Sequence, residues 1–147
     1  MTRISRSALV EVPIELAYQV VVDVERYPEF VPGCDEVKVL TRRDQGLDAR
    51  VTVTGAGMTQ SFVTRNQHNA GSITMVLTEG PLDHLQGVWH FNAIGEAGCR
   101  VEIDIDFAAG GVLATLFTPV ADKVANRLVD AFVERMDSLS GHTMAGQ

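Results

Sequence analysis

Residues 100–107 read RVEIDIDF. Every second residue of this stretch is apolar, and the residues between them are one arginine and three carboxylates. Side chains alternate between the two faces of a strand, so the stretch predicts a strand with one buried face and one wetted face. A sheet that is solvated on one side is typical of antiparallel pairing.

The same alternation recurs toward the N-terminus. It predicts further strands at 3–12, 37–39, 49–53, 61–66, 72–78 and 85–91. Glycine at residues 45–46 and 55–57 marks turns between neighbouring strands. The sequence therefore predicts a curved antiparallel sheet of about seven strands.

Two segments show a helical period instead. Pro13 suits the first turn of a helix, and Leu16, Val20 and Val24 then recur at every fourth residue. After residues 110–111 a longer apolar stripe follows spacings of three and four: Leu113, Phe117, Val120, Val124, Leu128, Ala131 and Phe132. We expect one or two short helices after the first strand, and a break at Pro119. A long helix follows that break and ends near Gly141.

An elbow separates the first helix from the next strand. Residues 27–34 read YPEFVPGC, with two prolines that restrict the backbone and two aromatic side chains. The element order is then strand, helix, elbow, six strands and long helix. This order predicts an α+β fold in which one long helix lies across the concave face of the sheet.

The composition limits the classes of function. The chain has 147 residues, 46% hydrophobic and 21% charged, which fits one globular domain spanning 1–147. A net charge of −7 argues against a general nucleic-acid binder and against a DNA partner, but it is compatible with one local basic patch. Two cysteines and no apolar leader or spanning segment predict a cytoplasmic protein.

Four motifs in this order resemble the START-like (helix-grip) superfamily. Within it, the chain is similar to the branch of the coenzyme Q-binding proteins and the ribosome-associated toxin RatA, often described as polyketide cyclase/dehydrase-like or oligoketide cyclase-like. The motifs are SRSALVEVP at 5–13, YPEFVPGC at 27–34, SFVTRN at 61–66 and GPLDHLQGVWHF at 80–91. Gly33 resembles RatA, because coenzyme Q-binding relatives commonly have Trp there. Asp83, His84 and His90 depart from it, because RatA-like chains often have Lys at these positions.

The resemblance implies an apolar cavity between the sheet and the long helix, with ubiquinone or another isoprenoid lipid as ligand and no cofactor. Tyr27, Phe30 and Pro32 would cap its mouth; the alternative is that the elbow only packs on the core. The lining residues would be Phe62, Met75, Leu77, Trp89, Phe91, Ile105, Leu113, Phe117, Val120, Val124 and Leu128.

No catalytic or metal-binding constellation is evident. His68, His84, His90 and His142 lack metal-ligand spacing, and Cys34 is expected to be a small buried residue. Arg65 has two open interpretations: it pairs with an acidic neighbour on the convex face, or it contacts a partner.

Three hypotheses of function remain. The first is a non-catalytic isoprenoid quinone carrier that supports respiration, with transient peripheral contact to the inner membrane. The second is a RatA-like protein that binds the large ribosomal subunit and blocks subunit association. The third is a polyketide cyclase or aromatase, which would need a polar group aimed into the cavity.

Overall fold

Seven strands form one antiparallel sheet in the computed structural model, which describes residues 2–55, 57–108, 110 and 121–145. The strand order is β1-β7-β6-β5-β4-β3-β2. The strands are β1 (Thr2–Val10), β2 (Cys34–Arg43), β3 (Gly46–Gly55), β4 (Met58–Asn69), β5 (Ser72–Glu79), β6 (His84–Ile94) and β7 (Gly98–Ala108). The predicted α+β helix-grip architecture is confirmed.

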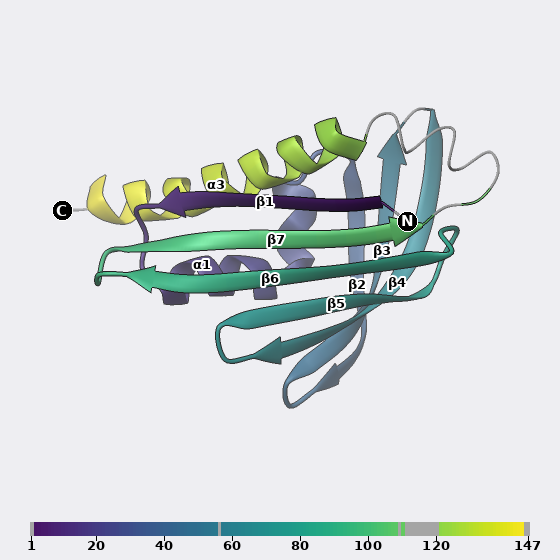
Figure 1. The fold of residues 1–147 in the computed structure, drawn as a ribbon, viewed down its shortest axis with the longest axis horizontal. Coiled ribbons are helices and arrows are strands. Elements are labelled where there is room, and N and C mark those ends of the chain that lie inside the picture. Colours follow the sequence, from purple (N-terminus) through teal and green to yellow (C-terminus); the bar gives the residue numbers. More distant parts are fainter. Residues whose placement is uncertain (1, 56, 109, 111–120, 146–147) are drawn as a thin grey trace.

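Within the described ranges, three helical elements accompany the sheet. α1 (Ile14–Val22) and the 3-10 helix η1 (Val24–Glu29) follow β1, and α3 (Ala121–Ala145) ends the described chain. In Figure 1 α3 runs alongside β1, α1 lies behind β6 and β7, and β2, β3 and β4 turn steeply away from the other strands. The sheet is therefore strongly curved, and the helices cover its inner face. Within the described residues, no helix is long and apolar enough to cross a membrane.

Of the two helix ends predicted from proline and glycine, the start at Pro13 is confirmed and the end near Gly141 is not. Pro13 precedes α1, and its carbonyl oxygen accepts hydrogen bonds from the amides of Leu16 and Ala17 at 3.0 and 3.2 Å. α3 continues through Gly141 to Ala145, so the predicted end near Gly141 is wrong. A glycine inside a helix costs only about 1 kcal/mol and does not by itself end the helix. The predicted break at Pro119 lies outside the described residues.

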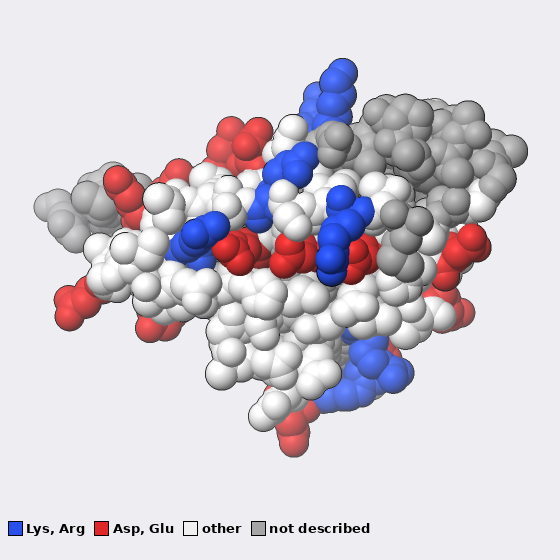
Figure 2. All heavy atoms as spheres, in the orientation of Figure 1, with Lys and Arg blue, Asp and Glu red and all other residues white. Residues whose placement is uncertain are grey.

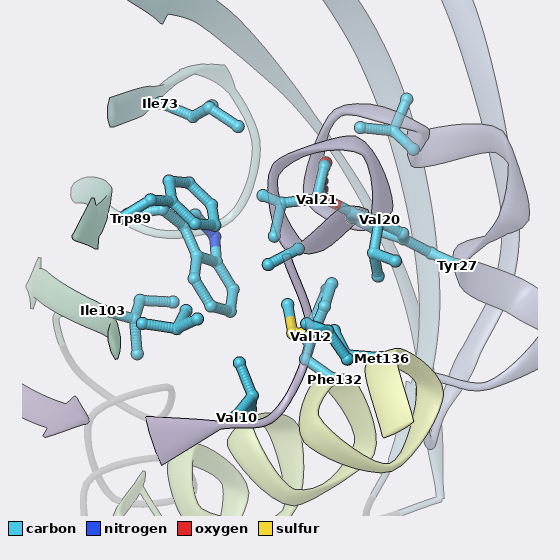
Figure 3. Packing of buried hydrophobic residues seen from close by; sticks show 14 of the residues in the cluster. Val10, Val12, Val20, Val21, Tyr27, Ile73, Trp89, Ile103, Phe132 and Met136 are labelled. Atoms are coloured by element: carbon cyan, nitrogen blue, oxygen red, sulfur yellow. Dashed lines mark hydrogen bonds between the residues drawn. The ribbon is translucent and has the colours of Figure 1, made fainter. Parts of the chain in front are cut away.

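The core lies where α1, η1 and α3 meet the inner face of the sheet. Figure 3 shows Trp89 of β6 among residues of the sheet, α1 and α3. The ring of Trp89 lies 4.8 Å from that of Phe132 on α3, centroid to centroid. Ile73, Val21 and Met136 are fully buried around this contact. The sheet, α1 and α3 are thus joined by side chains that are far apart in the sequence.

The buried stripe of α3 differs from the predicted one at its N-terminal part. Val124 is 58% exposed, whereas Ala125 is 3% exposed and packs beside Ile4 and Phe107. The buried positions then continue at Phe132 and Met136, spaced seven and four residues on. Val124 lies about 100° around the helix from Ala125, so it faces away from the sheet. Its assignment to the inner lining is therefore wrong.

We expect Phe132→Ala to lower the free energy of unfolding by about 3–5 kcal/mol, because it leaves a cavity among rings that are fully packed. Val124→Ala on the same helix is the matched control and should change it by less than about 0.5 kcal/mol, because that side chain is exposed. Urea unfolding followed by circular dichroism measures both. Equal losses for the two variants would contradict the observed orientation of α3.

Candidate functional site

The elbow packs on the core through its aromatic residues. Tyr27 is 9% exposed, and its hydroxyl donates a hydrogen bond to the carbonyl of Val21. The Tyr27 and Phe30 rings meet Phe132 edge to face, with centroids 5.2 and 5.1 Å away. The pKa of Tyr27 is raised far above its ordinary value. Burial is the largest cause, and the negative charges of Cys34 and Asp23 add to it. Tyr27 therefore stays neutral and joins η1 to α3.

The end of the elbow requires glycine. Gly33 has φ +79°, and a Cβ atom built there would lie 2.9 Å from the carbonyl oxygen of Thr54. The Gly33 carbonyl in turn accepts the Thr54 amide at 2.8 Å, which ties the elbow to β3. A tryptophan in this backbone geometry would be both strained and in collision with β3. The local structure thus fits the RatA-like form of the elbow motif.

The neighbours of Gly33 have separate roles. Pro32 is exposed, unlike the buried Cys34. Cys34 is 7% exposed. Burial is the main cause that raises the pKa of its thiol, and the charge of Asp35 raises it further. A protonated, buried thiol is a packing residue, as predicted from the sequence.

The interior beside the middle of α3 is nearly filled. The cavity between α3 and the sheet there has a volume of about 10 Å³. Its walls are Arg6, Ala8, Trp89, Val101, Ile103, Val129, Phe132, Val133 and Met136. One water molecule needs roughly 10–15 Å³, and small-molecule pockets measure about 300–1,000 Å³. This part of the interior has no room for an isoprenoid chain.

The predicted lining residues differ in how far they are buried. Trp89 and Phe91 are buried in the filled part, at 3% and 4% exposure. Phe62, Met75, Leu77, Ile105 and Leu128 are half-buried. Leu113, Phe117 and Val120 lie outside the described residues. Of the half-buried residues, Met75, Ile105 and Leu128 pack against the buried cluster that contains Trp89.

Open space remains next to Gly87 on the inner face of β6. Gly87 is the cross-strand partner of Met75 on β5 and of Ile105 on β7. A Cβ atom built on Gly87 would meet no described atom within 4 Å. The described inner face therefore leaves room for a side chain or another group at this point.

A polar row borders this space on β4. Thr64 and Asn66 are 7% and 3% exposed, and the Thr64 hydroxyl donates to Oδ1 of Asn66 at 2.9 Å. His68 continues the row, and among the described residues its buried Nε2 has no hydrogen-bond partner. Burial lowers the pKa of His68. The sequence analysis missed Asn66 and His68, although their period-two spacing after Thr64 was a usable signal.

Phe30 also borders a surface groove between α1, η1 and α3. The groove has a volume of about 270 Å³, and its walls are Leu16, Gln19, Val20, Asp23, Arg26, Phe30, Arg135 and Leu139. Arg135 lies over the Phe30 ring, 5.1 Å from its centroid, and pairs with Glu29 at 2.9 Å. The elbow therefore faces an outer groove, and this groove is separate from the filled cavity behind Phe132.

Arg65 forms an ion-pair cluster on the convex face. Asp48 accepts two hydrogen bonds from Arg43, at 2.8 and 2.7 Å, and a third from Arg65 Nε at 3.2 Å. These contacts, with Arg43 the largest contributor, lower the pKa of Asp48 to about 2. The first interpretation of Arg65, a pair with an acidic neighbour, is what the structure contains. The Arg65 side chain is still 61% exposed.

A curved antiparallel sheet with a long C-terminal helix on its inner face is the helix-grip arrangement of START-like proteins. A START superfamily protein from Mycobacterium smegmatis has the same fold, with a TM-score of 0.81 at 20% identity over 93% of this chain and 98% of that one. The family described as polyketide cyclase / dehydrase and lipid transport matches residues 10–133. The chain belongs to this family.

Two curated relatives indicate its position within the family. The ribosome association toxin RatA of Pseudomonas aeruginosa is 40% identical over 142 residues, which cover 95% of this chain and 99% of the relative. The mitochondrial coenzyme Q-binding protein COQ10 homolog B of Xenopus laevis is 27% identical over 93% of this chain and 59% of the relative. Both branches named by the motifs are therefore found, and RatA is the more similar.

We expect Asp48→Asn to lower the free energy of unfolding at neutral pH, because Arg43 and Arg65 lose their shared carboxylate. The folded pKa of about 2 lies below the ordinary 3.8, so the carboxylate stabilises the fold above about pH 4. That contribution is lost as the pH falls through about 2.

Urea unfolding at several pH values measures the difference between wild type and variant, which should shrink as the pH falls from neutral through this range. Asp44→Asn, an exposed residue in the neighbouring turn, is the control and should have little effect. A difference that is independent of pH would contradict the role assigned to Asp48.

Proposed function

We propose that this chain is a ribosome-associating protein that acts by binding, in the manner of its RatA relatives. The observation that carries the proposal is the match to relatives named ribosome association toxin, 40% identical and aligned over nearly their whole length. The resemblance further implies the large ribosomal subunit as the partner, and interference with subunit association as the effect.

Two features of the geometry support this proposal over the quinone carrier. The backbone of the elbow at Gly33 has a positive φ that requires glycine, and this suits the RatA-like motif. The cavity beside Phe132 measures about 10 Å³, which is too small for an isoprenoid ligand in that region. A filled interior in this region favours a function carried by the outer surface, and a ribosome is a large partner for such a surface.

Sedimentation tests the proposal directly. Purified protein is mixed with separated large and small ribosomal subunits and run on sucrose gradients at moderate salt. We expect it to migrate with the large subunit, and to reduce the amount of joined ribosomes when both subunits are present. An unrelated acidic protein of similar size serves as control. Protein that stays at the top of every gradient would overturn the proposal.

An apolar ligand is the second candidate function, and the open space at Gly87 favours it. Half-buried Met75 and Ile105 flank this glycine across the sheet, and Thr64 and Asn66 provide polar groups nearby. Such a mixture of apolar walls and a few polar groups suits a quinone, with an isoprenoid tail and a polar ring. The relation to a coenzyme Q-binding protein points to the same ligand class.

Mass spectrometry of organic extracts tests this second function. If a lipid occupies the space, protein from a quinone-producing host should release ubiquinone or another isoprenoid, and Gly87→Leu should release much less because the new side chain fills the space. Val88→Leu, on the outer face of the same strand, is the matched control and should retain the lipid. Wild-type protein that releases no lipid would rule the ligand out.

A further inference from the structure

The outer face of β2, β3 and β4 gathers four cationic side chains. Lys38 and Arg50 are direct cross-strand partners, and Arg65 lies opposite Asp48 on the next strand. Residues that point the other way from these strands are buried, for example Val37 at 9% and Ala49 at 0% exposure. Lys38, Arg43, Arg50 and Arg65 are all exposed. We call these four residues the convex basic patch.

Only part of the positive charge of the convex basic patch is neutralised by neighbouring carboxylates. Asp48 neutralises part of the charge of Arg43 and Arg65. Among the described residues, no carboxylate lies within ion-pair distance of Lys38 or Arg50. Like charges directly opposite each other on two strands are destabilising. The arrangement therefore has a cost in the free protein that a bound anion would offset.

On the other half of the convex face, along β7, the cationic side chains are paired with carboxylates. Arg3 pairs with Asp106 at 3.0 Å, and Arg100 pairs with Glu102 at 3.0 Å. Figure 2 shows this acidic row along β7 with basic residues beside it, then an uncharged band over β6 and β5, and a separate basic cluster at the lower right over the β2–β4 side. The net charge of −7 therefore conceals a face whose charges are segregated.

The side chains of the patch suit phosphate groups. Guanidinium groups bind phosphate oxygens in a bidentate manner, and Arg65 uses only its Nε toward Asp48. The hydroxyls of Thr52 and Ser61, paired at 2.9 Å on the same face, add small polar groups beside it. The outward positions of these strands carry three arginines and a lysine against the carboxylates of Glu36 and Asp48, so the surface is net positive and suits a polyanion.

The kind of polyanion follows from what accompanies the cations. The outward positions of β2–β4 carry no aromatic side chain among the described residues, so there is no platform on which unpaired bases would stack. Double-helical RNA is recognised mainly through its backbone and shape. An anionic membrane would instead favour apolar side chains that insert beside the cations. Val63, opposite Arg50, is only 5% exposed, and the exposed apolar residues beside the patch are Leu40 on β2 at 41% and Val76, opposite Arg65, at 38%. Two aliphatic side chains, each less than half exposed, offer little apolar area for insertion into a membrane.

We propose that the convex basic patch binds the phosphate backbone of double-helical RNA, without base-specific contacts. The inference deepens the proposed function, because it makes a helix of ribosomal RNA the element that this protein recognises on the ribosome. Asp48 acts as a positioning residue, since it holds the guanidinium groups of Arg43 and Arg65 in place.

The test uses the double variant Lys38→Glu/Arg50→Glu of the full chain. Lys123→Glu/Arg127→Glu, at two exposed positions of α3, is the matched control with the same change of net charge. Fluorescence anisotropy with a labelled RNA hairpin measures affinity between about 50 and 200 mM salt. We expect the patch variant to bind at least about tenfold more weakly, with a salt slope smaller by about two. The control should keep both values near wild type.

Circular dichroism and urea unfolding confirm that the variants fold, and Lys38→Gln/Arg50→Gln provides a milder second variant. Equal losses in patch and control variants, or no loss in either, would overturn the inference. Binding to anionic phosphatidylglycerol vesicles in preference to RNA would also overturn it.

The two proposals fail separately. If the patch variant still sediments with ribosomes as wild type does, the patch is not the contact and ribosome association stands. If wild type binds the RNA hairpin through the patch but never sediments with ribosomes, the proposed function fails and the RNA-binding surface stands.

Discussion

The contact of Phe132 with three other rings holds the layers of this protein together. Phe132 comes from α3, Trp89 from the sheet, and Tyr27 and Phe30 from the elbow. Edge-to-face pairs of this kind stabilise by more than their buried area alone. Because these residues are separated by up to about a hundred positions in the chain, the contact fixes the place of the elbow and of the C-terminal helix at once.

This contact also divides the interior. Where Phe132 and Met136 meet Trp89, the side chains fill the space and leave about 10 Å³. Farther along the sheet, Gly87 presents no side chain, and the described atoms leave room beside it. A START-like fold is therefore not equivalent to one large hollow. Within the described residues, the unfilled space on the inner face lies beside Gly87, in the same cross-strand row as Met75 and Asn66.

Much of the architecture could be predicted from the sequence because strands with one wet face have a clear period of two. The elbow was also predictable, since its prolines and aromatics are local signals. The side of α3 was harder, because one residue along a helix changes the direction by about 100° and the apolar run contains both Val124 and Ala125. The inward Asn66 and His68 were missed because polar residues in a strand are usually read as solvated. The open space at Gly87 depends on neighbours from three strands, which no local pattern contains.

The convex basic patch shows a further limit of sequence patterns. Lys38 and Arg43 are five residues apart on β2, so a regular strand would place them on opposite faces. The register shifts between Val39 and Thr41, and Arg43 comes to lie opposite Gly46 on the outer face. Bulges of this kind are known to redirect side chains near functional sites. A single irregularity in an edge strand thus adds Arg43 to the patch and brings it to Asp48, which also receives Arg65. An acidic chain acquires in this way a cationic surface that its overall charge does not suggest.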